Sequence, residues 1–251
     1  MKSIEIVPLL QDNYSYLIRY GKKAFVVDPS ESGLIAQKLQ KKSSTLSHIL
    51  VTHSHADHVG GVAELAKRYG ASVIGPKDPK IPCLDHPLDD GERVIIGPYF
   101  VRALSTPGHS SAHLAFLLEE ERILFTGDLL FGCGAGKLEE DSQDCAHTMW
   151  SSLEKILAFE EDTQIYPGHE YTKQNLSFAA HLEKENPWLN ERALSLEKKS
   201  AKLVPTTLGL EKKTNPFLRA NRIEMQRLVA QETATPGDAL WEIRKRKNRF
   251  S

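Results

Sequence analysis

Four short apolar runs in this 251-residue chain each end in a histidine or an aspartate. The runs are HILVTH to His53, RALSTPGH to His109, RILFTGD to Asp128 and QIYPGH to His169. Apolar runs of this length predict buried strands, and loops just beyond strand ends can converge on one rim of a sheet. A glycine directly before a polar residue, as before Asp128, permits a sharp turn and a close backbone approach. We therefore expect a sheet-based fold that gathers these four side chains.

The strand and helix patterns along the chain predict an α/β fold. Further strand-length runs are IEIVPL, YLIRY, AFVVDPS, ASVIGP, RVIIG, YFVRALS and HLAFLLE. Gly97-Pro98 predicts a turn between the two runs at 93–105. VAELAKRYG is spaced as a helix that ends at Gly70, and a second helix is expected over about 144–159. Strands with interspersed helices are typical of layered α/β proteins.

The pattern changes after about residue 172, where helical sequences replace strand-length runs. NLSFAAHLEKEN, NERALSLEKKSAK and NRIEMQRLVAQ predict helices. Thr235 to Asp238 resemble a capping box at the start of a last helix, with a proline in its first turn. We therefore expect an α/β domain over 1–172 and a small helical domain over 173–251.

Composition and charge exclude several classes of protein. The net charge is −1, so the whole molecule has no bias towards nucleic acid or membranes. The N-terminus lacks a signal-peptide pattern, and no run approaches the roughly 18 apolar residues of a membrane span. The three cysteines show no CxxC spacing, which favours a reducing cytoplasm over a disulfide framework. We expect a cytoplasmic protein.

The segment THSHADHVGG adds three ligand-type side chains to the four at strand ends. The seven candidates are His53, His55, Asp57, His58, His109, Asp128 and His169. A catalytic zinc site takes three protein ligands and leaves one position for water, so seven ligands suit two metals if one carboxylate bridges them. Imidazole plus carboxylate fits Zn, Fe or Mn. The absence of GxSxG, and of a cysteine among the seven, disfavours a serine or cysteine nucleophile.

THSHADHVGG resembles the HxHxDH signature of the metallo-β-lactamase superfamily, whose fold is a four-layer αββα sandwich. TPGH at 106–109, TGD at 126–128 and PGH at 167–169 follow in the order of that superfamily. DNYSYLI, GHEYTKQNL, NPFLR and the terminal IRKRKNRF are similar to the hydroxyacylglutathione hydrolases, also called glyoxalase II. That family has a C-terminal helical domain that binds substrate, so the resemblance spans nearly the whole chain.

Carried over to this chain, the resemblance implies two divalent metal ions, with zinc favoured and iron or manganese as alternatives. One metal would take His53, His55 and His109, the other would take Asp57, His58 and His169, and Asp128 would bridge them. Asp28, in VVDPS, would orient a ligand histidine by accepting its other N–H. Among the other histidines, His113 lies four residues beyond His109 and is the best candidate to support the site.

The resemblance also implies a thioester hydrolase for S-(2-hydroxyacyl)glutathione, such as S-D-lactoylglutathione, in methylglyoxal detoxification. Metal-bound hydroxide would attack the thioester carbonyl, with Asp57 and Asp128 as catalytic residues and Asp57 orienting the hydroxide. A thiol has a pKa of about 8.5, so a thiolate leaves with little general-acid help. The expected partner is therefore a glutathione thioester, bound by a monomer.

The family's substrate contacts map onto Lys137, Tyr171, Arg244 and Lys247. The loop GCGAGKLEED at 132–141 departs from the family, because Leu138 and Glu139 stand where the family has aromatic residues. The departure leaves open whether glutathione or another thiol carrier is selected.

Two other functions stay open at the level of the sequence. A metal-dependent phosphodiesterase or nuclease of the same fold is favoured by the RKRKNR tail, since basic clusters contact phosphates, but the near-zero net charge argues against nucleic acid. A mononuclear iron persulfide dioxygenase has a similar fold and needs only one metal, so metal stoichiometry distinguishes it.

Overall fold

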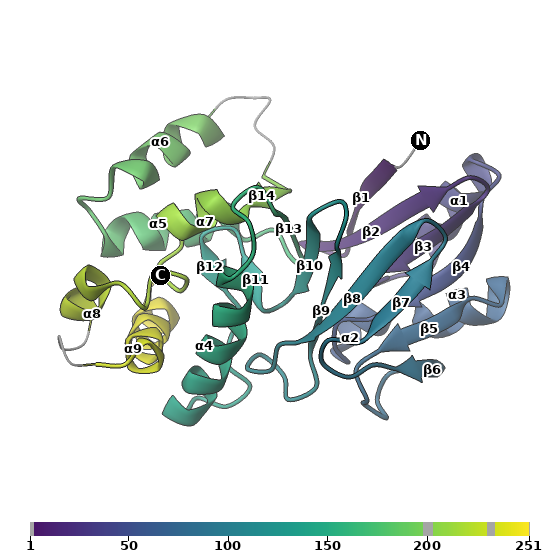
Figure 1. Ribbon diagram of the computed structural model, residues 1–251. Coiled ribbons are helices and arrows are strands. Elements are labelled where there is room, and N and C mark those ends of the chain that lie inside the picture. The colour runs from purple at the N-terminus through teal and green to yellow at the C-terminus, as the bar shows by residue number, and fades with distance from the viewer. Residues whose placement is uncertain (1–2, 198–202, 230–233, 251) are drawn as a thin grey trace. The chain divides into compact units, whose positions relative to one another are not determined.

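The structure is a computed structural model that describes residues 3–197, 203–229 and 234–250 (Figure 1). The C-terminal ends of two predicted helices, NERALSLEKKSAK and NRIEMQRLVAQ, lie outside these residues.

The chain divides into two compact units. The first unit comprises Met1–Ser105 and Ala112–Gly127, and the second comprises Thr106–Ser111 and Asp128–Ser251. The loop at 106–111 thus belongs to the second unit although it joins two strands of the first. The domain boundary expected near residue 172 stays a prediction.

Six strands form the first sheet, in the order β1-β2-β3-β4-β5-β6. They are β1 (Ser3–Leu9), β2 (Asn13–Tyr20), β3 (Lys23–Val27), β4 (Thr45–Leu50), β5 (Ser72–Gly75) and β6 (Leu84–Pro87). Strands β1 to β3 are antiparallel and β3 to β6 are parallel. The predicted strands are confirmed in β1 to β5. Strand β6 was missed because LDHP contains no apolar run.

The first unit also contains four antiparallel strands of a second sheet, in the order β7-β8-β9-β10. They are β7 (Arg93–Ile96), β8 (Tyr99–Ser105), β9 (Leu114–Leu118) and β10 (Ile123–Gly127). The turn predicted between β7 and β8 is confirmed, and Gly97 adopts φ +59° there. A Cβ on Gly97 would lie 2.3 Å from the Tyr20 ring, so only glycine fits this turn.

The two sheets of the first unit pack face to face through aromatic side chains. The Tyr16 and Phe125 ring centroids are 5.2 Å apart, and those of Phe25 and Tyr99 are 5.5 Å apart. Such contacts between strands of different sheets make a sandwich with an apolar interior.

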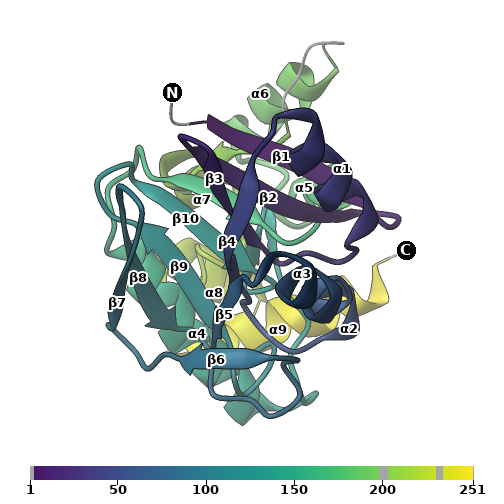
Figure 2. The ribbon, with the colours of Figure 1, turned by 90° about the vertical axis from the view of Figure 1, so that its right-hand side faces the viewer.

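Helices α1 (Gly33–Lys41) and α3 (Val62–Tyr69) cover the outer face of the first sheet (Figure 2). Their buried side chains, including Leu39 and Leu65, share one core with strand residues such as Val26. The predicted end of α3 is confirmed, since Gly70 is its left-handed C-cap. The first unit is therefore a helix–sheet–sheet arrangement, with the short helix α2 (Ala56–Val59) between β4 and α3.

The second unit is mainly helical. Its helices are α4 (Gln143–Leu157), α5 (Thr172–Leu182), α6 (Pro187–Leu196), α7 (Leu208–Thr214), α8 (Ile223–Val229) and α9 (Pro236–Arg249). Its strands are β11 (Leu130–Phe131), β12 (Gly134–Ala135), β13 (Gln164–Pro167) and β14 (Thr206–Thr207). The capping box from Thr235 to Asp238 is confirmed. The expectation that strands end near residue 172 was wrong, because β14 pairs with β13 and is too short to show an apolar run.

A buried ion pair organises the second unit. Arg192 Nη2 donates to Glu211 Oε1 at 2.6 Å, and the two side chains are 3% and 0% exposed. The other carboxylate oxygen of Glu211 accepts from the backbone N of Cys133 at 2.8 Å. Burial, and then the Glu211 charge, raise the pKa of the Cys133 thiol to about 12. The pair thus ties α6, α7 and the loop after β11 together.

Replacing Arg192 by Met should lower the free energy of unfolding by about 3–5 kcal/mol, because Glu211 would keep a buried charge without its partner. Urea denaturation measures this loss. Glu242→Gln is the control, since Glu242 pairs with Lys245 at a partly exposed position, where such pairs contribute less than about 1 kcal/mol. Equal losses in the two variants would contradict the prediction.

Candidate metal centre

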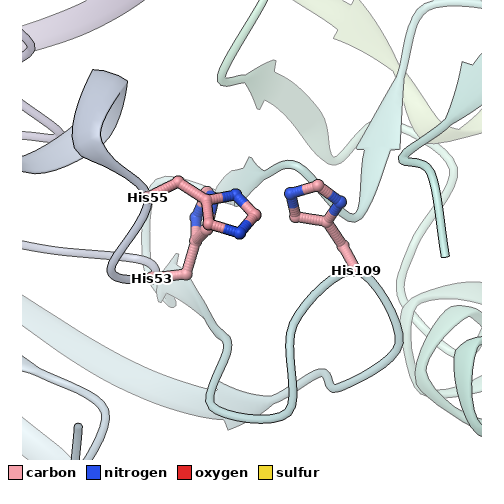
Figure 3. Close-up of side chains that lie close together, drawn as sticks. All are labelled: His53, His55 and His109. Atoms are coloured by element: carbon pink, nitrogen blue, oxygen red, sulfur yellow. The ribbon is translucent and has the colours of Figure 1, made fainter. Parts of the chain in front are cut away.

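The histidines of THSHADHVGG lie in the segment between β4 and the first turn of α2. His55 is the extended N-cap residue of α2, so Asp57 and His58 follow in its first turn. His53 Nε2 lies 3.0 Å from His55 Nδ1, and Figure 3 shows the His55 ring in front of the His53 ring. The ring of His58 lies 4.2 Å from that of His53. The segment therefore gathers its three imidazoles within the first unit.

Asp28 connects the end of β3 to these histidines. Its Oδ1 accepts from Thr52 N and its Oδ2 accepts from Thr52 Oγ1, both at 2.7 Å. Oδ2 also lies 3.0 Å from His58 Nδ1. A carboxylate can only accept, so His58 carries its proton on Nδ1 and leaves the Nε2 lone pair for a ligand. This is the contact that an orienting role for Asp28 requires.

Thr52 orients His53 in the same way, through a hydrogen bond to its Nδ1 atom. Its Oγ1 lies 3.0 Å from His53 Nδ1, and its single proton is already donated to Asp28. The hydroxyl therefore accepts from His53 Nδ1, which leaves the Nε2 lone pair of His53 available. Thr52 was missed in the sequence analysis, since nothing in a threonine before a histidine signals this role.

Asn13 holds Asp57 from the start of β2. Its Nδ2 donates to Asp57 Oδ2 at 3.0 Å and to the Asp57 backbone oxygen at 3.1 Å. Asn13 is buried, whereas the Asp57 side chain is 40% exposed. Asn13 was also missed, although it belongs to the DNYSYLI segment that carries the family resemblance.

His113 lies beside the first-unit histidines. It is buried, and its ring centroid is 5.1 Å from that of His53. A Cβ on Gly127 would lie 2.8 Å from His113 Nε2 and 2.5 Å from Thr52 Oγ1. The end of β10 can therefore reach this position only as glycine, which explains the glycine of TGD.

The second unit brings His109, Asp128 and His169 together. Asp128 Oδ2 lies 3.4 Å from His109 Nε2 and 3.3 Å from His169 Nε2. His109 Nδ1 donates to the Lys137 carbonyl oxygen at 2.9 Å, which leaves its Nε2 lone pair available. Asp128 Oδ2 thus lies between the Nε2 atoms of two imidazoles.

The donor atoms of each unit have the spacing of metal ligands. Ligands about 2.0–2.1 Å from a tetrahedral metal lie about 3.3–3.4 Å from one another. The observed separations are 3.0 Å for His53–His55, 3.7 Å for Asp57–His58, and 3.3 and 3.4 Å around Asp128. These histidine and aspartate donors fit a divalent metal ion.

The predicted substrate contacts all lie in the second unit and differ in exposure. The Lys137 side chain is exposed, and the Tyr171 ring stacks on His169 with centroids 5.0 Å apart. Lys247 is half-buried. Arg244 is buried and donates to the carbonyl oxygens of Ala135 and Gly136. The two basic residues of α9 therefore have different surroundings.

Glu139, which departs from the family pattern, contacts the loop that carries His109. Its backbone N donates to the Gly108 carbonyl oxygen at 2.9 Å, and its Oε1 accepts from Ser111 Oγ at 3.1 Å. The acidic side chain thus has a partner within its own unit.

Family comparisons agree with the arrangement of motifs. A model described as the metallo-beta-lactamase superfamily matches residues 10–169, and one described as the hydroxyacylglutathione hydrolase C-terminus matches 170–250. The chain is 41% identical to the hydroxyacylglutathione hydrolase of Rhizobium meliloti (strain 1021), over 95% of both chains. It is 40% identical to that of Rhodopseudomonas palustris (strain BisB5), over 98% of both.

Solved structures share the fold. ETHE1 from Myxococcus xanthus matches with a TM-score of 0.69 and 23% identity, over 97% of this chain and 90% of that one. TTHA1623 in a di-iron-bound form matches with a TM-score of 0.61 and 26% identity, over 86% of this chain and 99% of that one.

The fold and the match over residues 10–169 define a member of the metallo-beta-lactamase superfamily, and the predicted α/β class is confirmed. The match continues through the C-terminal region of one family within it. The chain belongs to the hydroxyacylglutathione hydrolases, which are metal-dependent hydrolases. Among the described residues, no helix is long and apolar enough to span a bilayer.

Replacing Asp28 by Asn should weaken zinc binding by about 10–100-fold. The backbone N of Thr52 and His58 Nδ1 use different oxygens of Asp28, and an amide has only one oxygen that can accept. A competition titration against a chromophoric chelator measures the affinity. Asp85→Asn is the control, since this carboxylate on β6 also accepts a backbone N–H, from Val73. An unchanged zinc affinity in Asp28→Asn would exclude an orienting role for Asp28.

Proposed function

We propose that the chain is a two-metal thioester hydrolase. Its substrate would be an S-(2-hydroxyacyl)glutathione, foremost S-D-lactoylglutathione, and its products a 2-hydroxy acid and glutathione. One observation carries the proposal: a chain similar to hydroxyacylglutathione hydrolases over 95% of its length has its histidine and aspartate donors at metal-ligand spacing.

The candidate ligands of each unit fall into two groups, which supports two metal ions. In the first unit His53 pairs with His55, and His58 pairs with Asp57. In the second, Asp128 lies between His109 and His169. One metal would take His53, His55 and His109, the other would take Asp57, His58 and His169, and Asp128 would bridge. Zinc is favoured, with iron and manganese as alternatives, and the related TTHA1623 has a di-iron-bound form.

Bound divalent ions would supply a Lewis acid and lower the pKa of water towards neutrality. The chain's own residues would orient the attacking water and bind the substrate. Asp57, held by the Asn13 amide, would accept a hydrogen bond from the attacking water and orient it. The leaving thiolate, with a thiol pKa of about 8.5, needs little general-acid help.

The glutathione carboxylates require cations, and Lys247 is the best placed on α9. Burial, and then the charge of Arg244, lower the pKa of Lys247. Its Nζ donates to the Gln174 carbonyl oxygen at 3.5 Å, and no carboxylate among the described residues is its anionic partner. A bound carboxylate would supply that partner. Lys137, Tyr171 and Arg244 would provide further contacts.

We further propose that the enzyme works as a monomer in the cytoplasm, where the free thiols of Cys83, Cys133 and Cys145 fit a reducing compartment. The mononuclear persulfide dioxygenase gains no support from an aspartate that lies between two histidines, since this arrangement suits two metals. The phosphodiesterase alternative is disfavoured by the net charge of −1 and by the match of residues 170–250 to the hydroxyacylglutathione hydrolase C-terminus.

Protein of measured metal content should hydrolyse S-D-lactoylglutathione far faster than the same acyl group on a thiol without carboxylates. It should contain about two metals per chain, as two-metal hydrolases do. Chelation should abolish turnover, and zinc, manganese or iron should restore it. Thiol release measured with a disulfide reagent follows the reaction. If two metals are bound but turnover of the two esters is equal or absent, the natural substrate is another thioester. One bound iron per chain would overturn the two-metal proposal.

Replacing Lys247 by Ala should raise KM for the glutathione ester about tenfold or more, since a hydrogen bond between charged groups contributes about 1.5–3 kcal/mol. The value of kcat and the metal content should stay unchanged. Lys245→Ala is the matched control, because Lys245 lies on the same helix and pairs with Glu242. Equal KM values in the two variants would exclude Lys247 as the carboxylate contact.

A further inference from the structure

Helix α4 holds the loop that carries His109. The Ser152 hydroxyl donates to the Pro107 carbonyl oxygen at 2.6 Å. Gly108 adopts φ +135°, and a Cβ on it would lie 2.6 Å from Met149 Cβ, so only glycine lets the loop backbone meet the helix this closely. The position of the loop is therefore fixed relative to α4.

The same helix is joined to the first turn of α9 through one carboxylate. The two helices lie side by side (Figure 1). Gln143 and His147, which are one turn apart on α4, both contact Asp238 Oδ1, with Gln143 Nε2 at 2.6 Å and His147 Nε2 at 2.9 Å. A carboxylate can only accept, so both nitrogens donate. Asp238 therefore links α9 to α4 by two hydrogen bonds.

The other oxygen of Asp238 caps its own helix. Oδ2 accepts from Thr235 N at 2.9 Å and from Thr235 Oγ1 at 2.7 Å. The hydrogen bonds from Thr235, with those from His147 and Gln143, hold the pKa of Asp238 well below its usual range. The carboxylate therefore stays charged at neutral pH, and each of its oxygens has a separate task.

The imidazole of His147 packs directly on the backbone of α9. A Cβ on Gly237 would lie 2.6 Å from His147 Cγ. Both helices also bury apolar side chains, among them Leu153 on α4 and Leu240 on α9. Apolar contacts are non-directional, whereas hydrogen bonds require a defined geometry. The polar contacts of His147 therefore set the position of α9 along α4.

We propose that His147 is a positioning residue for the substrate-binding cations of α9, acting through Asp238. The proposal rests on the proposed function, because it requires that His109 is a metal ligand and that Lys247 and Arg244 contact glutathione carboxylates. Helix α9 is continuous, so a displacement of its first turn also moves the two cations. Since α4 holds both the His109 loop and the start of α9, it sets the distance between the reacting carbonyl and the carboxylates of one substrate. Contacts at the two ends of a substrate contribute fully only when that distance is correct.

The test variant is His147→Ala. KM for the glutathione ester should rise about 2–10-fold, as expected for a residue that acts through a network of contacts. KM for the same acyl group on a thiol without carboxylates, the value of kcat and the zinc affinity should stay unchanged, because the His109 loop keeps its contacts with α4. The dissociation constant of S-methylglutathione, measured by calorimetry on the zinc-loaded protein, should rise by a similar factor without any turnover.

His147→Gln is the conservative variant, since the glutamine amide can donate to Asp238 in place of the imidazole, and it should restore the wild-type KM. Thr148→Ala is the matched control. Thr148 is the next residue on α4, and its hydroxyl donates to the Asp144 carbonyl oxygen of the same helix. This variant should leave both KM values and the dissociation constant unchanged.

Two further variants reach the same contact from other sides. Gln143→Ala removes the second donor to Asp238 and should also raise KM for the glutathione ester. Gly237→Ala should displace the imidazole and show the same pattern as His147→Ala. In the double variant, Gly237→Ala should add little to His147→Ala, because the two changes remove one contact.

KM and dissociation constants in His147→Ala that equal those of the wild type would overturn the proposal. Equal losses for both esters, or weaker zinc binding, would also overturn it, since they would indicate a general effect on folding. If the wild-type protein binds S-methylglutathione but hydrolyses neither ester, the proposed function fails, while the dissociation constants still decide the role of His147. Absence of both binding and hydrolysis in the wild type would overturn both proposals.

Discussion

The candidate centre depends on one kind of interaction, a hydrogen bond that holds the Nδ1 atom of an imidazole. His58 has the Asp28 carboxylate, His53 has the Thr52 hydroxyl, and His109 has the Lys137 carbonyl oxygen. Each partner accepts, so each ring keeps its proton on Nδ1 and presents the Nε2 lone pair. Without these acceptors the rings could rotate or exchange tautomers, and the donor spacing would be lost.

The Asp28 acceptor is itself held by buried polar groups, and a separate buried polar network stabilises the second unit. Asp28 accepts from both the backbone and the hydroxyl of Thr52. In the second unit, Arg192 and Glu211 form a buried ion pair that also receives the backbone N of Cys133. Removing one member of such a network leaves a buried polar group unsatisfied. These buried polar groups therefore stabilise the positions of the residues around them, and substitutions of the groups themselves are poorly tolerated.

Much of the fold could be predicted from the chain because the signals are local. Alternation and length of apolar runs predicted β1 to β5 and β7 to β10, Gly70 predicted the end of α3, and Thr235 predicted the start of α9. Strands β6 and β14 were missed because four and two residues carry no periodicity. The candidate ligands could be proposed from the sequence because each stands in a short motif.

The sequence by itself determined which residue types can hold metal, the strands that end in them and the family to which the chain belongs. These depend on nearest neighbours along the chain. Only the tertiary structure revealed the roles of Asn13 and Thr52 and the burial of Arg244. The contacts of Asn13 with Asp57 and of Arg244 with Gly136 join residues that are 44 and 108 positions apart in the sequence. No local pattern encodes them, because a basic residue on a helix has the same sequence signature whether it faces solvent or a buried carbonyl.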